Sequence, residues 1–392
     1  MNDGAQNQLQ RLQPAGSWIG ITGLVLCGIG AGLIPHQAFV SYLFAFTFWT
    51  GLSLGCLTLA LIHHLTGGGW GFLVRRFLEA GFMTLPLMAL LFVPVCLGVR
   101  ELYPWSHPDI VAASETLRSK QLYLNLPAFL ARALVCFGLW VLLARLLRRW
   151  SLEQDTTSDP APTIRLRALS GPGLLLHVLL ATFAFIDWVM ATDPEWHSSM
   201  FPVIVLIGQV LSAVALGTVM LGWLASRSPF REVTEPRHFR DLGNLLLAFV
   251  MFWTYVSFSQ YLIIYSGNLP SEIRWYQHRS ARSWVAILWL LAAVHFFVPF
   301  LLLLFRAVKR ARSRLLAVAA LVFMAQMLGV FWLIAPTFYP GGLRFHWLDL
   351  AAVLGVGGLW AARFVAELKA QPLLPRNDPR IEYTVRITAH AK

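Results

Sequence analysis

Long apolar stretches, separated by short polar breaks, recur along the chain from residue 18 to residue 366. A helix needs roughly 20 apolar residues to cross the hydrocarbon core of a bilayer. By this criterion the pattern predicts ten spans, near residues 16–34, 38–64, 72–98, 122–147, 169–191, 200–226, 241–266, 281–305, 313–336 and 345–366. We therefore expect an all-α polytopic membrane protein. The first span is expected to be retained rather than cleaved as a signal peptide, because its apolar stretch is long and only Arg11 precedes it.

The composition excludes a soluble globular protein. Hydrophobic residues make up 57% of the chain and charged residues 13%, and the mean hydropathy is +0.62, whereas soluble domains carry about 25% charged residues. The polar breaks are too short for a folded domain outside the membrane. The four cysteines lie at wide spacing within apolar stretches, which predicts neither a metal site nor a disulfide framework.

Basic residues divide unequally between the two sets of loops that ten spans create. One set, together with both termini, carries 23 of the Lys and Arg residues, the other set carries seven, and Arg132 lies within a span. Cytoplasmic loops of membrane proteins are enriched in Lys and Arg. We therefore expect both termini in the cytoplasm. The net charge of +12 is explained by this orientation and implies no nucleic-acid partner.

Small residues lie one turn apart in the first span, at Gly16, Gly20, Gly28 and Gly32. Such spacing allows helix backbones to approach closely. Two interpretations stay open here: packing within the chain, or a docking face for a neighbouring subunit. The last span, with Gly355 and Gly358, allows the same two interpretations.

Few ionisable residues fall inside the spans, and each is costly in hydrocarbon, at about 2.5 to 3.5 kcal/mol on insertion scales. Glu79 lies about two turns into the third span and Arg132 lies in the fourth, where we expect a structural charge. His177 and Asp187 share the fifth span, about 15 Å apart at the helical rise. His295 is central in the eighth span, and Asp193 and His197 follow the fifth.

Five of these groups are candidates for a proton path: Glu79, His177, Asp187, Asp193 and His295. The seventh span adds polar side chains at helical spacing, among them Tyr255 and Gln260. The competing interpretation is hydrogen bonding between helices, which contributes about 0.6 kcal/mol per pair. A haem held by two histidines would need His177 together with His295, since no span carries two histidines deep in the core, and we regard it as the weakest hypothesis.

Several short sequence motifs along the chain identify a family more specifically than the hydropathy pattern does. They are Tyr123-Leu124-Asn125 before Pro127 and Arg132, Trp150-Ser151 with Gln154-Asp155, Ile186-Asp187-Trp188, Trp196-His197-Ser198 with Phe201-Pro202, Phe258-Ser259-Gln260-Tyr261-Leu262-Ile263-Ile264, Gly267-Asn268-Leu269-Pro270, Glu272, Trp275-Tyr276 and Arg279, His346-Trp347-Leu348-Asp349, and Pro372-Leu373-Leu374-Pro375 before Asp378-Pro379-Arg380. Over essentially its whole length the chain resembles the F-type membrane protein of bacterial alternative complex III, a quinol:electron acceptor oxidoreductase. The F-type protein and its C-type companion in that complex both resemble the membrane subunit of polysulfide and nitrite reductases.

The resemblance implies a fold and a setting. It implies two four-helix bundles, within residues 38–191 and 192–336, flanked by residues 1–37 with the first span and residues 337–392 with the last. It also implies a bacterial inner-membrane location in a respiratory or photosynthetic electron transfer chain. The expected partners are a homologous quinol-binding subunit, multihaem cytochrome c and iron-sulfur subunits, and small membrane subunits. Haem c and the clusters would belong to those partners, and this chain would bind no cofactor except possible quinone.

The fifth span departs from the C-type companion. In that protein the corresponding segment carries a His where this chain has Asp187, followed six residues on by an Asp that matches Asp193, and quinol is thought to bind there. The replacement of that His by Asp187 makes quinol oxidation by this chain doubtful and favours a proton-conducting or scaffolding role. Asp187, Asp193 and His197 nevertheless stay candidates for facing quinone.

Two other functions stay open from the sequence. The chain could bind quinol in its own right, with Asp187 as the base. It could also be an independent secondary transporter, a class that uses broken helices around a site at the membrane midplane. Pro86, Pro94 and Pro299 give a weak form of that pattern.

Overall fold

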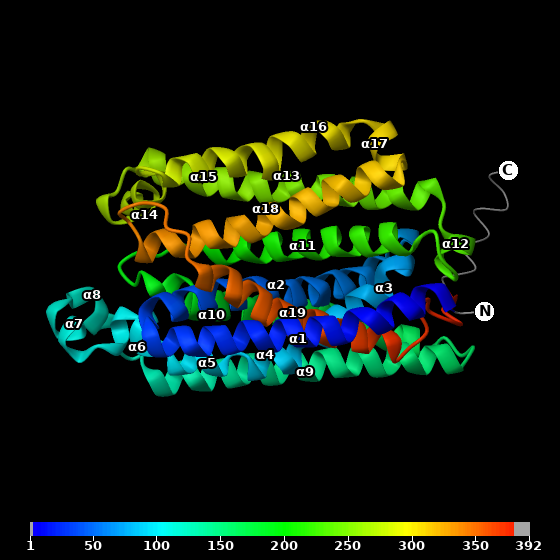
Figure 1. Ribbon diagram of the computed structural model, residues 1–392, viewed down its shortest axis with the longest axis horizontal. Coiled ribbons are helices and arrows are strands. Elements are labelled where there is room, and N and C mark those ends of the chain that lie inside the picture. The colour runs from blue at the N-terminus through cyan, green and yellow to red at the C-terminus, as the bar shows by residue number, and fades with distance from the viewer. Residues whose placement is uncertain (1–2, 380–392) are drawn as a thin grey trace.

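The computed structural model describes residues 3–379 (Figure 1). Helices account for 84% of the structure, and the described residues contain no strand. Within residues 3–379, ten helical segments are long and apolar enough to cross a membrane. They are Leu9–Leu33, Pro35–Thr66, Gly69–Leu97, Leu126–Thr156, Ala161–Thr192, Phe201–Leu224, Pro236–Gly267, Trp284–Leu304, Arg312–Phe338 and Trp347–Lys369. The predicted all-α polytopic membrane fold is confirmed.

Seven spans are single helices, and three are divided or continued by a shorter element. The long helices are α1 (Asp3–Leu33), α2 (Pro35–Thr66), α9 (Leu126–Thr156), α10 (Ala161–Trp188), α11 (Phe201–Leu224), α13 (Pro236–Gly267), α18 (Arg312–Phe338) and α19 (Trp347–Lys369). The third span consists of α3 (Gly69–Phe82), α4 (Leu85–Leu90) and α5 (Val93–Leu97), and the eighth of α15 (Trp284–Leu291), the π-helix η3 (Ala292–Phe297) and α16 (Val298–Leu304). The connections hold α6 (Val99–Leu102), η1 (Pro104–Ser106), α7 (Pro108–Ala113), α8 (Glu115–Lys120), η2 (Met190–Thr192), α12 (Phe230–Val233), α14 (Pro270–Ser280) and α17 (Arg306–Arg310).

Helices extend further than the apolar stretches that predicted them. The polar break expected at residues 151–167 is reduced to residues 157–160, because α9 and α10 continue into it. Gln154 holds this short turn. Its Nε2 donates to the Thr157 and Asp159 carbonyls, at 3.1 and 2.9 Å, and its Oε1 accepts from the Thr163 backbone at 3.1 Å.

Proline marks the interruptions of the third and eighth spans. Pro86 and Pro94 lie in the first turns of α4 and α5. Backbone N–H groups in a first turn make no helical hydrogen bond, so proline is tolerated there. The chain turns before each of these prolines, at Met83–Thr84 and Leu91–Phe92. Pro299 similarly begins α16 directly after the π-helix.

The spans lie roughly parallel in two groups that meet along α2 and α11 (Figure 1). The first group contains α2, α3 to α5, α9 and α10, and the second contains α11, α13, α15 to α16 and α18. One continuous cluster of buried apolar side chains extends through both groups. The two groups therefore share a core, with α2 and α11 at its centre.

Helices α1 and α19 pack against each other through glycine. A Cβ atom at Gly20 would lie 2.5 Å from the Leu359 backbone nitrogen, and one at Gly23 would lie 2.5 Å from Gly355 Cα. Gly16 and Gly358 also lie in this contact, whereas a Cβ atom at Gly28 or Gly32 would meet no neighbouring atom within 4 Å. The small residues of the first span are thus divided: Gly16 and Gly20 serve packing within the chain, and Gly28 and Gly32 face outward.

The start of α1 and the end of α19 lie at the same end of the molecule (Figure 1). We call this the basic end; it comprises residues 66–69, 156–161, 225–235, 305–311 and 370–379. The opposite end comprises residues 98–125, 189–200, 268–283 and 339–346. Met1, Arg380 and Lys392 lie outside the described residues.

Candidate functional site

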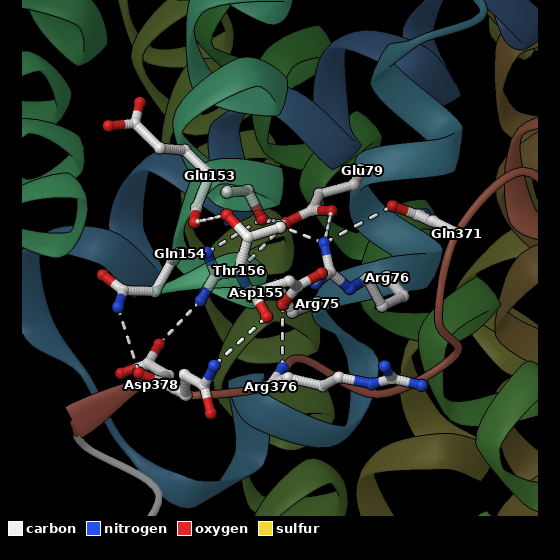
Figure 2. A network of polar contacts seen from close by, with 12 residues as sticks. Arg75, Arg76, Glu79, Glu153, Gln154, Asp155, Thr156, Gln371, Arg376 and Asp378 are labelled. Atoms are coloured by element: carbon white, nitrogen blue, oxygen red, sulfur yellow. Dashed lines mark hydrogen bonds and ion pairs between the residues drawn. The ribbon is translucent and has the colours of Figure 1, made fainter. Parts of the chain in front are cut away.

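Glu79 is the centre of a buried network of ion pairs at the basic end (Figure 2). It lies on α3, one turn after Arg75 and Arg76, and all three side chains are at most 2% exposed. Arg75 Nε donates to Glu79 Oε1 at 2.9 Å, and Arg76 donates to Oε2 at 2.6 Å. One helix face therefore presents a carboxylate clamped by two guanidinium groups.

Three other segments complete the network. From α9, Arg148 donates to Glu79 Oε2 at 3.4 Å, Ser151 donates to Oε1, and Asp155 pairs with Arg76. From the chain after α19, Asp378 pairs with Arg75 at 2.7 Å. From α19 itself, Glu367 pairs with Arg148 at 3.5 Å. The network thus joins α3, α9, α19 and the segment that follows α19.

The hydrogen-bonding capacity of Glu79 is filled. Each of its two oxygens has two donors: Oε1 accepts from Arg75 and Ser151, and Oε2 accepts from Arg76 and Arg148. A carboxylate offers about four acceptor positions. Glu79 can therefore take up a proton only when one of these donors moves away.

A second buried ion pair joins α9 to α10 nearer the opposite end. Arg132 Nε donates to Asp187 Oδ2 at 2.6 Å, and its Nη2 donates to Oδ1 at 3.2 Å. Asp187 is 2% exposed and the Arg132 side chain 22%. The Tyr123 ring lies 3.9 Å from the Arg132 guanidinium. Two residues that the sequence assigned to different roles, a structural charge and a proton carrier, therefore form one unit.

His177 lies between the two clusters, on α10. It is fully buried, and its Nε2 lies 2.8 Å from Thr58 Oγ1 on α2. Because the Thr58 hydroxyl donates to the Leu54 carbonyl at 2.9 Å, it can accept from the imidazole. His177 Nδ1 has no hydrogen-bond partner among the described residues.

Aromatic rings fill the space around the C-terminal half of α10. Trp188 contacts Phe137 in a stacked arrangement with centroids 5.3 Å apart, and Phe92 at 4.9 Å. Trp140 contacts both Trp188 and His177, each at 6.1 Å. His177 and Asp187 lie about 15 Å apart along α10. The aromatic cluster therefore lies beside the part of the helix between them.

The remaining candidates lie apart from these groups, in the second group of helices or at the opposite end. Gln260 on α13 donates to the Tyr276 hydroxyl and accepts from Ser198, both at 3.0 Å. Tyr255, on the same helix, is 68% exposed. His295 is fully buried in the π-helix against Trp253, with ring centroids 4.0 Å apart, and neither of its nitrogens has a hydrogen-bond partner among the described residues.

Asp193 and His197 lie in the connection that follows α10. His197 is exposed, and Asp193 is half-buried near basic side chains of the opposite end. One of them is Lys120, whose pKa burial lowers and the neighbouring Asp193 raises, with a net decrease; its Nζ donates to the Pro194 carbonyl at 2.7 Å. The structure brings Asp187 together with Arg132, and Glu79 with three arginines, but it does not join the candidates of α13 or His295 to them.

Sequence reasoning missed the partners of Glu79. Arg75 and Arg76 precede it by four and three residues, a helical spacing at which opposite charges meet, and this signal was readable. Asp378 and Glu367 lie far away along the chain, and no local pattern points to them. The described residues contain no group of three or more His, Cys, Asp or Glu side chains that could hold a metal ion.

Comparison with protein-family models and with curated proteins finds no match for this chain.

Proposed function

We propose that this chain is an integral membrane subunit of a bacterial quinol:electron acceptor oxidoreductase of the alternative complex III type. In this proposal it contributes a proton path and a scaffold beside the subunit that oxidises quinol. The observation that carries the proposal is the placement of buried ionisable groups at both ends of one group of helices, Glu79 at the basic end and Asp187 toward the opposite end, with His177 between them. Buried charges in a membrane are costly and usually functional.

The proposed orientation puts the basic end in the cytoplasm of the cell and leaves the opposite end in the periplasm. The excess of Lys and Arg in the loops of the basic end supports it. Protons would then enter near Glu79 and leave near Asp187, or travel in reverse.

Each end of the proposed path is closed by arginine. A proton reaches Glu79 only when one of its four donors leaves. Asp187 accepts two hydrogen bonds from Arg132, and protonation of Asp187 removes the negative charge that strengthens this pair. Trp140 contacts both His177 and Trp188, so aromatic rings lie beside this part of α10. Conduction in this proposal therefore needs a second state, in which the Arg132–Asp187 pair opens and water enters beside α10.

The redox chemistry is proposed to belong to partner subunits. These would be a homologous quinol-binding membrane subunit, multihaem cytochrome c and iron-sulfur subunits, and small membrane subunits. Purification tests this part, because a respiratory subunit should be isolated with cytochromes. A chain that is isolated active and alone would contradict it.

A series of variants that neutralise the charges of Asp187 and Arg132 tests the proton path. We expect Asp187→Asn to preserve assembly and haem content of the complex and to lower turnover or proton yield per electron in sealed vesicles. Because this variant also leaves Arg132 without its partner, Arg132→Gln and the double variant are the matched controls. If the pair is purely structural, the double variant should restore both stability and turnover. If Asp187 carries protons, the double variant should restore stability alone.

Asp193→Asn completes the series, because Asp193 lies outside the ion pair. Unchanged turnover and proton yield in both Asp187→Asn and Asp193→Asn would refute the proposed path. Loss of quinol binding with intact assembly would instead favour the alternative in which this chain binds quinol itself.

The transporter alternative draws on one observation, the interruption of the third and eighth spans at proline. Transporters of that class break helices at corresponding positions of two repeats. Here the interrupted span is the second in one group of helices and the third in the other, so the positions do not correspond. Isolation as a homo-oligomer without cytochromes would favour this alternative.

A further inference from the structure

A small cavity lies where the two groups of helices meet, between α2, α11 and α18. About 10 Å³ of it is open to the centre of a water molecule, which is about the room one water needs. Four of its lining side chains are polar: Thr47 from α2, Gln209 and Ser212 from α11, and Gln326 from α18. Gln209 begins the third turn of α11, about 12 Å from the start of that helix.

The polar atoms around this cavity lack partners. Gln209 Nε2 and Oε1, Gln326 Oε1 and Thr47 Oγ1 have no hydrogen-bond partner among the described residues. The three side chains are 3 to 5% exposed. Buried polar groups in native proteins are nearly always paired, with protein or with ordered water. Unpaired polar atoms on three side chains that line one cavity therefore indicate a bound polar ligand.

Close helix packing fixes these side chains at the cavity. A Cβ atom at Gly55 would lie 2.1 Å from the Gln209 carbonyl oxygen, and one at Gly208 would lie 2.4 Å from Gln326 Nε2. Glycine at these two positions lets α2, α11 and α18 approach closely enough to enclose both amides.

We propose that this cavity is a binding site for one water molecule that links the two groups of helices. The water accepts from the Gln209 amide and donates to Gln326 Oε1 and Thr47 Oγ1. Three hydrogen bonds are typical of a buried water. Rotation of either amide exchanges donor for acceptor and keeps the site complete, because water can act as both. The Ser212 hydroxyl donates to the Gly208 carbonyl at 3.1 Å, so its oxygen is free to accept. The site is independent of the proposed proton path.

Radiolytic hydroxyl labelling of the intact chain in a lipid nanodisc tests the water directly. Bound water generates radicals in place, so a side chain beside it is modified although it is buried. Phe48 lines the cavity, and Phe364 is an equally buried phenylalanine that stacks on Trp360 of α19. We expect Phe48 to be labelled several-fold faster than Phe364. Equal, near-zero labelling of the two rings would overturn the proposal.

Substitution of the glutamines gives a second test, because a hydrated cavity and a dry cavity predict changes in melting temperature of opposite sign. With water bound, Gln326→Met and Gln209→Met each remove a partner of the water, so the melting temperature should fall and Phe48 labelling should drop to the Phe364 level. In a dry cavity the same variants remove unpaired polar atoms, and the melting temperature should rise. If a variant fails to fold, the labelling of the unmodified chain still decides the question.

Discussion

Both buried carboxylates that the sequence put forward as proton carriers form ion pairs with arginine. Glu79 is bonded to Arg75, Arg76 and Arg148, and Asp187 is bonded to Arg132. A buried ion pair often contributes little net stability, because desolvation offsets the attraction, yet removal of one partner is severe. Residue-level tests should therefore separate the loss of a partner from the loss of a proton site.

Glu79→Gln should destabilise the protein by about 3 to 5 kcal/mol, because it leaves two or more buried guanidinium groups without their shared carboxylate. Thermal unfolding in detergent, followed by circular dichroism, measures the effect. Glu153→Gln is the matched control. Glu153 pairs with Arg165 at the surface, where both side chains are more than a third exposed, and loss of such a pair costs about 1 kcal/mol or less. Equal effects of the two substitutions would contradict the central place of Glu79.

Part of the candidate site was predictable from the sequence. The membrane cost of charge singled out Glu79, His177 and Asp187, which are buried, and Arg132, whose side chain is 22% exposed. The helical spacing of Arg75, Arg76 and Glu79 was also present in the sequence. The Arg132–Asp187 pair was not predictable. The apolar pattern of α9 and α10 fixes neither the rotation of each helix nor their neighbours, so it cannot say which polar faces meet.

At the scale of elements, hydropathy located all ten spans but not their ends. A bilayer criterion measures apolar length, whereas a helix continues as long as its backbone and capping groups are satisfied. The extension of α9 to Thr156 and the start of α10 at Ala161 depend on the bonds made by Gln154, which the hydropathy of these residues does not report. Breaks at proline were visible in the sequence, but the π-helix at His295 had no signal there.

The α1–α19 contact depends on glycine at one face of each helix. Gly20→Leu should destabilise this contact by about 1 to 3 kcal/mol or more, because a Cβ atom there overlaps the backbone of Leu359. Protection of α1 from proteolysis in detergent should fall with it. Gly28→Leu, on the outward face of the same helix, is the control and should change stability by no more than about 0.5 kcal/mol. A larger effect at Gly28 than at Gly20 would contradict the observed packing.

At the scale of the whole molecule, the segment after α19 connects α3 and α9 at the basic end. Asp378 pairs with Arg75, Gln154 donates to the Asn377 carbonyl at 3.0 Å, and the Arg376 backbone donates to Asp155 at 2.8 Å. These contacts join the last described residues to α3 and α9 (Figure 2). The number of spans and the fold class were predictable from hydropathy alone, but this closure was not, because it pairs residues some 300 positions apart.

Asp378→Asn should loosen this closure, because the neutral amide holds Arg75 less strongly than the carboxylate does. We expect faster amide hydrogen exchange in residues 371–379 and in the first turns of α3, with α11 unchanged. Mass spectrometry of the purified protein measures both. Asp241→Asn, which removes a surface pair with Arg240, is the control and should leave these segments as they are. Unchanged exchange in Asp378→Asn would show that the backbone contacts alone secure the segment.

The position of the charge partners also has a consequence for biogenesis. Arg75, Arg76 and Arg148 enter the membrane early in synthesis, when Glu79 and Asp155 are the only acidic members of their network. Glu367 and Asp378 emerge last, and so does α19, which covers the glycine face of α1. A chain interrupted before α19 therefore keeps an unneutralised guanidinium in a buried position and an uncovered first helix. Completion of translation therefore supplies the last acidic partners of these arginines and the helix that packs on α1.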